Sequence, residues 1–202
     1  MGLDRNRLIK RIEAVEGKRN ACYMLDGIPH IGIGHNIVSR SLEDSTLEFL
    51  GIEDESDLIK KELTDEQCYY LLDRDLDIAI SDVQQLIGGR VFDDLSGLRQ
   101  EVLIDMSFNL GRPRLSKFKN MLAAVKSGNF NEAGAEILDS KAARDPLTRK
   151  RYQALASEMS GDSEPTIDPF VSIQSGIAES DIQKISSEDL MSELLRRIKG
   201  GV

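Results

Sequence analysis

The sequence predicts a mainly α protein of the α+β class, with one small β-hairpin near its N-terminus. Three observations support this fold class. Apolar residues recur at helical spacing through most of residues 4–160. An Asp-Gly pair at residues 26–27, the strongest two-residue hairpin signal, joins two short β-prone runs. Glycines close several of the helical stretches, as helix C-terminal caps commonly do.

The first elements are a helix and the hairpin. A helix is expected over residues 4–16, because its apolar stripe stops at Gly17, a natural cap. The run ACYML-DG-IPHIGI, residues 21–33, reads as two strands around the turn of Asp26 and Gly27. The N-terminal part of the chain therefore combines one helix with a tight hairpin.

Helices are expected in most of the remaining chain. Residues 39–61 are acidic and only weakly periodic. A long helix follows, opened by a capping box of Thr64 and Gln67 and ended by Gly88. Four more helical patterns follow in GLRQEVLIDMSFNLG (97–111), LSKFKNMLAAVKSG (115–128), NFNEAGAEILDSKAA (129–143) and DPLTRKRYQALASEM (145–159), the last with Pro146 near its first turn.

The composition changes near residue 160 and predicts two parts, residues 1–160 and residues 161–202. Residues 160–176 are rich in Ser, Gly, Pro and Asp, as linkers are. Residues 186–199 have the pattern of an amphipathic helix, which could dock on a protein partner or fold back on its own body.

Charge and hydropathy exclude several classes of function. The net charge is −9, with 35 acidic against 26 basic residues, which argues against nucleic-acid binding. It also argues mildly against long-range attraction to an anionic wall polymer. No apolar run approaches the roughly 20 residues that a membrane span requires. The charged N-terminus lacks a signal-peptide core, so we expect synthesis in the cytoplasm. The two cysteines lack metal-ligand spacing, and no metal site is expected.

One constellation of motifs resembles a known family. Glu16 and Gly17 end the first helix, Tyr23 lies in the hairpin, and IGIGH occupies residues 31–35. This arrangement, together with the later blocks LTDEQCYYLLDRDLDIAI, LIDMSFNLG, FKNML and ARDPLTRKR, is similar to the phage T4-type lysozymes over roughly residues 5–160. The resemblance implies a glycoside hydrolase of peptidoglycan without metal or cofactor. It also implies a two-lobed fold with a hairpin lobe, a helical lobe and a cleft between them.

Glu16 is the expected proton donor. Glycosidic cleavage needs a carboxylic acid that delivers a proton to the leaving oxygen. Glu16 ends a helix, where the macrodipole disfavours a negative charge and so favours the protonated acid. Gly32 and Gly34 remove side chains from the hairpin, which would let a sugar ring lie against bare backbone.

The second catalytic group of the family has no direct counterpart here. Its carboxylate position falls on Leu25, or on Met24 when counted back from the IGIGH motif, and its threonine position falls on His30. Asp26 could swing inward and replace the missing acid, although it is by default a turn former. His30 could act instead, as a base or opposite the cationic centre; its bland alternative is a surface histidine on an edge strand, which Pro29 suggests. Third, a single carboxylate could suffice, as in lytic transglycosylases.

The resemblance implies roles for further residues. His35 and Asp75 are expected to form a structural ion pair. Substrate contacts are implied for Gly34, Phe108, Asn109, Ser140 and Lys141, and a pairing with the catalytic glutamate for Arg149 or its neighbour Thr148.

Two functions compete at this point. The favoured one is a muramidase that cleaves the β-1,4 bond between N-acetylmuramic acid and N-acetylglucosamine, acting in the periplasm or from within a virion. Its rival is a wall-binding structural component of a phage particle that kept the fold and lost turnover, which the altered second position and the acidic charge would favour.

Overall fold

The computed structural model describes residues 2–38 and 42–161. The predicted linker beyond residue 161 and the helix predicted at residues 186–199 therefore lie outside the described residues. The described chain forms two compact units. One, the sheet unit, runs from Glu16 to Arg74; the other, the helical unit, combines the residues up to Val15 with those from Asp75 onward.

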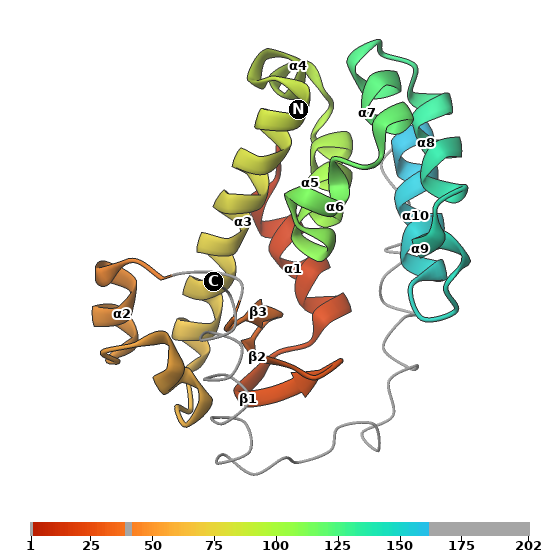
Figure 1. Ribbon diagram of the computed structural model, residues 1–202. Coiled ribbons are helices and arrows are strands. Elements are labelled where there is room, and N and C mark those ends of the chain that lie inside the picture. The colour runs from red at the N-terminus through yellow and green to blue at the C-terminus, as the bar shows by residue number, and fades with distance from the viewer. Residues whose placement is uncertain (1, 39–41, 162–202) are drawn as a thin grey trace, which may run out of the picture. The chain divides into compact units, whose positions relative to one another are not determined.

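The sheet unit contains a three-stranded antiparallel sheet in the order β1-β2-β3 (Figure 1). The strands are β1 (Arg19–Leu25), β2 (Ile28–Gly32) and β3 (His35–Asn36). Asp26 and Gly27 connect β1 to β2 with φ of 50° and 73°, the positive values that a type I′ turn requires. The predicted hairpin is confirmed, and the short third strand extends it.

The suggestion that Pro29 marks an edge strand is wrong, because β2 is the central strand. Pro29 lies opposite Met24 of β1, while the pairing of β2 with β3 begins only at His30. Proline lacks an N–H, but its carbonyl still accepts a hydrogen bond from the Ile37 N–H at 3.1 Å. The missing donor is tolerated because β3 is too short to need it.

The weakly periodic segment folds into two short helices, α2 (Asp44–Leu50) and the 3-10 helix η1 (Glu55–Ile59). Their helical pattern is hard to see because each offers only two buried residues. These residues join the sheet in an apolar core formed by Ile31, Ile37, Leu42, Leu50, Leu58, Ile59, Leu63, Cys68 and Leu71.

The long helix α3 (Asp65–Ile87) begins as predicted. The Gln67 N–H donates to the Thr64 hydroxyl, and the Thr64 N–H donates to the Gln67 side-chain carbonyl, both at 3.1 Å. This reciprocal pair is a capping box, which satisfies two N–H groups at the helix start. The boundary between the two units falls inside α3, after Arg74.

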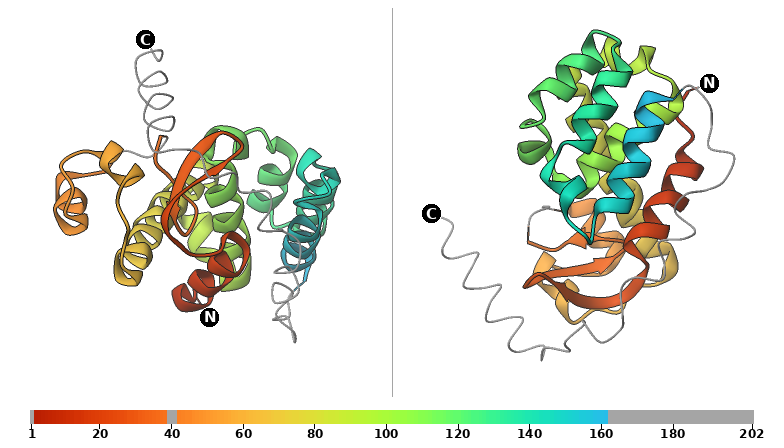
Figure 2. Two further views of the ribbon diagram at one scale, coloured as in Figure 1. Left: turned by 90° about the horizontal axis from the view of Figure 1, so that it is seen from below. Right: turned by 90° about the vertical axis from the view of Figure 1, so that its right-hand side faces the viewer.

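The helical unit is built around α5, in which every residue from Gly97 to Phe108 is buried. A helix buried on all sides is the central element of its unit. α10 packs against α5, and α8 runs beside α10 in Figures 1 and 2. The bounds are α1 (Arg5–Glu16), α4 (Gly89–Asp94), α5 (Gly97–Leu110), α6 (Arg112–Leu115), α7 (Lys119–Lys126), α8 (Phe130–Leu138), α9 (Lys141–Arg144) and α10 (Arg149–Ser160).

Three of the predicted helices are shorter than expected. The pattern over 129–143 divides into α8 and α9, because α8 ends at Leu138 and Ser140 caps the start of α9. The pattern over 115–128 splits between α6 and α7, because Leu115 ends a turn that Arg112 begins. The helix predicted over 145–159 starts only at Arg149, so Pro146 lies just before α10. Among the described residues, no helix is both long enough and apolar enough to cross a bilayer.

Candidate active site in the sheet unit

Glu16 is the last residue of α1, and Gly17, with φ of 71°, turns the chain from this helix into β1. The Glu16 side chain is half-buried. Its charge acts on Tyr23: burial and then the Glu16 carboxylate raise the pKa of the Tyr23 phenol to about 12, against a smaller opposing effect of Arg19. The carboxylate and the phenol therefore belong to one electrostatic cluster.

His30 belongs to the same cluster. It is the cross-strand partner of Tyr23, and the two rings stack with centroids 5.7 Å apart and planes 28° from parallel. The Arg19 guanidinium carbon lies 4.6 Å from the centroid of the Tyr23 ring. The side chains of Arg19, Tyr23 and His30 thus form a layer on one face of the hairpin, with each of them half-buried.

Hydrogen bonding constrains the protonation of His30. Its Nδ1 lies 2.9 Å from the carbonyl oxygen of Ile28. A carbonyl can only accept, so this hydrogen bond requires the proton on Nδ1. The neutral ring then carries its basic lone pair on Nε2.

The alternative acid, Asp26, is placed differently. It is exposed at the tip of the turn, in the left-handed conformation that short polar residues tolerate. Leu25, at the family's carboxylate position, is 50% exposed, and Met24 packs against the core of the sheet unit. Neither has a group that can activate water.

The two glycines of the IGIGH motif differ. Gly32 is buried with φ of 65°, and a Cβ built on it would lie 3.7 Å from the Cα of Cys68 in α3. The expectation of a bare sugar-facing surface at Gly32 is wrong, because its open side packs on that helix. Gly34 is half-buried with φ of 74°, and its backbone hydrogen bond lowers the pKa of Tyr23 against the larger effects that raise it.

The predicted substrate contacts of the helical unit have mixed exposure. Phe108 is buried, whereas Asn109 is exposed and accepts a hydrogen bond from the Tyr152 hydroxyl at 3.2 Å. Ser140 caps α9 by accepting from the Ala143 N–H, and Lys141 is exposed on the first turn.

Four further predicted residues have local partners or are buried. The Arg149 guanidinium donates to the Arg144 carbonyl, and the Thr148 hydroxyl donates to the Ala142 carbonyl. His35 is buried in the sheet unit and Asp75 in the helical unit. The roles in substrate binding and ion pairing assigned to these residues stay predictions. Among the described residues, no three His, Cys, Asp or Glu side chains gather where they could hold a metal.

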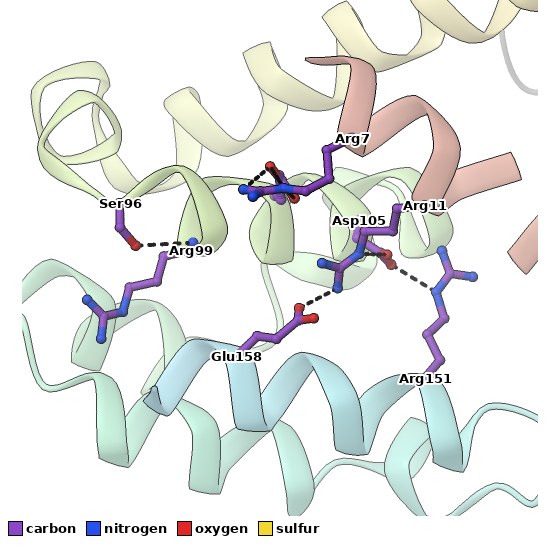
Figure 3. Close-up of polar contacts among 8 residues, drawn as sticks. Arg7, Arg11, Ser96, Arg99, Asp105, Arg151 and Glu158 are labelled. Carbon is purple, nitrogen blue, oxygen red and sulfur yellow. Dashed lines mark hydrogen bonds and ion pairs between the residues drawn. The ribbon is translucent and has the colours of Figure 1, made fainter. Parts of the chain in front are cut away.

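Sequence reasoning missed a buried ionic network in the helical unit (Figure 3). Arg11 of α1 pairs with Asp105 of α5 (Nε–Oδ2 3.0 Å) and with Glu158 of α10 (Nη2–Oε2 2.7 Å). Arg151 of α10 reaches the other Asp105 oxygen at 2.8 Å. All four side chains are at most 7% exposed. The available signal was Glu101 and Asp105, two acids four residues apart in the apolar helix pattern of residues 97–111.

A second ion pair lies one helical turn away. The Arg7 guanidinium donates from Nε to both Glu101 oxygens, at 2.9 and 3.0 Å, and its Nη2 lies 2.7 Å from one of them. Glu101 is fully buried, and this burial raises its pKa against the opposing effect of Arg7. Burial likewise raises the pKa of Glu158 against the effect of Arg11.

A carboxyl group at a helix end and, on the adjoining hairpin, a phenol stacked on an imidazole are side chains that can carry acid–base chemistry. Comparison with known proteins gives the family. The model described as Phage lysozyme matches residues 13–157, and the chain belongs to the phage lysozyme family. In general terms it is therefore a peptidoglycan-hydrolysing glycosidase. No curated protein matches the sequence.

Proposed function

We propose that this protein is a muramidase that cleaves the β-1,4 bond between N-acetylmuramic acid and N-acetylglucosamine. It would act on peptidoglycan in the periplasm, during host lysis, or from a virion during wall penetration. The observation that carries the proposal is the cluster of Glu16, Tyr23 and His30, in which the Glu16 carboxylate acts on the Tyr23 phenol and the Tyr23 ring stacks on the His30 imidazole. Membership of the phage lysozyme family supports the substrate class.

Glu16 is the proton donor in this proposal. Its carboxylic acid protonates the glycosidic oxygen as the bond from that oxygen to the anomeric carbon breaks, and the positive charge of the sugar ring develops. Tyr23 keeps its proton at neutral pH, because the ordinary pKa of 10.0 already lies well above neutrality and is raised to about 12 here. At neutral pH Tyr23 is therefore an uncharged phenol and does not add a second negative charge to the Glu16 carboxyl group.

His30 is the second group. With the proton on Nδ1 held by the Ile28 carbonyl, Nε2 can accept a proton from water as the water oxygen bonds to the anomeric carbon. The products are a reducing sugar end and a free hydroxyl. His30 then releases its extra proton to solvent, and Glu16 takes up a proton from solvent, which restores both groups. The exposed turn position of Asp26 favours His30 over Asp26 for this role.

Clearing of chloroform-treated Gram-negative cells tests the role of Glu16. Glu16→Gln removes the transferable proton and should lower the rate of clearing by about 10²-fold or more. Glu13→Gln is the matched control, since Glu13 lies on the same helix one turn earlier and should clear at the wild-type rate. An inactive wild-type protein would instead favour the wall-binding structural component.

The choice between His30 and Asp26 needs a second comparison. His30→Ala should reduce activity far more than Asp26→Asn, because the exposed turn residue keeps its turn-forming ability as asparagine. The reverse order of the two effects would assign the second role to Asp26.

A lytic transglycosylase is the second candidate, favoured by Leu25 and Met24 at the family's carboxylate position. In that reaction the sugar's own hydroxyl replaces water, and the product carries an anhydro end. Mass analysis of digested peptidoglycan separates the two reactions. Reducing ends are expected for the muramidase, whereas anhydro ends would overturn it in favour of the transglycosylase.

A further inference from the structure

The buried ionic network joins three helices of the helical unit at matched positions. Arg7 and Arg11 lie four residues apart on α1, and they pair with Glu101 and Asp105, four residues apart on α5. On the opposite side of Arg11 lies Glu158 of α10 (Figure 3). Residues four apart share one helix face, so the two ion pairs between α1 and α5 fix both the rotation and the register of α1 against α5.

Apolar packing alone would fix this register less strictly. Leu8 and Ile12 of α1 are fully buried, but apolar contact is non-directional and tolerates repacking. A shift of α1 by one turn, about 5.4 Å, would take Arg11 away from Asp105 and leave a buried carboxylate with fewer partners. The two ion pairs therefore select one register of α1 against α5 among several that the apolar side chains could accept.

We infer that Arg11 is a positioning residue for the catalytic acid, acting through the helix that carries both residues. The inference rests on the proposed function, in which Glu16 is the proton donor. α1 is one continuous helix from Arg5 to Glu16, and five residues, about 7.5 Å of helix rise, separate Arg11 from Glu16. A rotation or slip of α1 at Arg11 is carried to its last residue. An error of about 1 Å in the position of a catalytic group can cost about 10²-fold in rate.

The test replaces the network as a whole, because removing one member would leave a buried charge alone. The two cations and two anions are exchanged together for apolar residues of similar size, so the net charge is unchanged: Arg11→Met, Asp105→Leu, Arg151→Met and Glu158→Leu. We expect a folded protein whose kcat falls at least 10-fold while KM changes less than about 2-fold. A folded quadruple variant with the wild-type kcat overturns the inference.

A single substitution covers the case in which the quadruple variant does not fold. Arg11→Lys keeps the positive charge but loses the planar fork that contacts Asp105 and Glu158 together. Its kcat should also fall at unchanged KM. The control is Arg144→Met, which removes an exposed ion pair with Asp139 in the same unit and should leave kcat unchanged. A wild-type kcat in Arg11→Lys would count against positioning.

A readout without turnover separates this inference from the proposed function. In the Glu16→Gln background, the backbone amide NMR shifts of residues 12–17 should move when the network is replaced, and stay in place in the Arg144→Met control. Unmoved shifts overturn the positioning of α1. If Glu16→Gln is as active as the wild type, the proposed function itself is wrong. If Glu16→Gln is inactive and the quadruple variant is fully active, the proposed function stands and only the positioning inference is wrong.

Discussion

The two units of the chain place their charges in opposite ways. Within the described residues of the sheet unit, no Asp, Glu, Lys or Arg is buried, although residues 42–74 contain eleven acidic and three basic residues. Among the described residues of the helical unit, seven such side chains are buried: Arg11, Asp75, Arg99, Glu101, Asp105, Arg151 and Glu158. The sheet unit thus has an apolar core with its charges at the surface, whereas the helical unit builds charges into its interior.

This difference separates the groups proposed for catalysis from the charged groups that hold the helices in place. The groups proposed for catalysis, Glu16 and His30, are half-buried, where they can meet a substrate and exchange protons. The buried charges of the helical unit cannot do so, and they act on one another. We therefore expect substitutions at the hairpin cluster to change activity with little loss of stability, and substitutions in the network to change stability first.

The largest expected effect is on the helical unit. Arg11→Met leaves Asp105 and Glu158 buried with one cation fewer, and should lower the free energy of unfolding by about 3–5 kcal/mol. His30→Ala, at a half-buried position of the hairpin, should cost about 1 kcal/mol while it removes most activity. Urea unfolding followed by far-UV circular dichroism measures both values.

Tyrosine fluorescence shows which unit responds, because the chain has no Trp and three of its four Tyr residues, Tyr23, Tyr69 and Tyr70, lie in the sheet unit. If Arg11→Met lost no more stability than His30→Ala, the buried charges would not differ from surface ones. The contrast between the two units would then be wrong.

The sequence predicted the features that neighbouring residues decide, and it did not predict the contacts between distant segments. The hairpin turn at Asp26 and the capping box at Thr64 were predictable, because local chemistry decides them. So was the position of Glu16 at the end of α1. The network was not, because nothing local indicates that Arg11 will meet an acid that lies 94 residues further along the chain.

The burial of Gly32 against α3 and the central place of β2 were missed for a similar reason. Both depend on elements that have weak sequence signals, such as the two-residue strand β3. Pairings between distant segments carry the information in such cases, and periodicity within one segment does not.

A second, smaller effect concerns pH and the hairpin cluster. Because the Tyr23 pKa is raised to about 12 from 10.0, the folded protein holds this proton more tightly than the unfolded chain. The resulting stability contribution is complete below about pH 10 and is lost as the pH rises through about 12. Absorbance at about 295 nm should show a tyrosinate step near pH 12 that Tyr23→Phe removes. Tyr70→Phe, at an exposed ring of the same unit, should leave that step in place.

The smallest expected effect is at the N-terminus of α3. It tests how much local hydrogen bonds contribute to the stability of the sheet unit, which lacks buried Asp, Glu, Lys and Arg among its described residues. Thr64→Ala removes one half of the capping box and should lower the free energy of unfolding by about 1 kcal/mol. Gln67→Ala should cost more, because the Gln67 amide also donates to the carbonyls of Phe49 and Leu50 at the end of α2. Urea unfolding followed by tyrosine fluorescence measures both. Equal losses in the two variants would mean that α2 gains nothing from Gln67, and that its apolar packing alone holds it on the sheet unit.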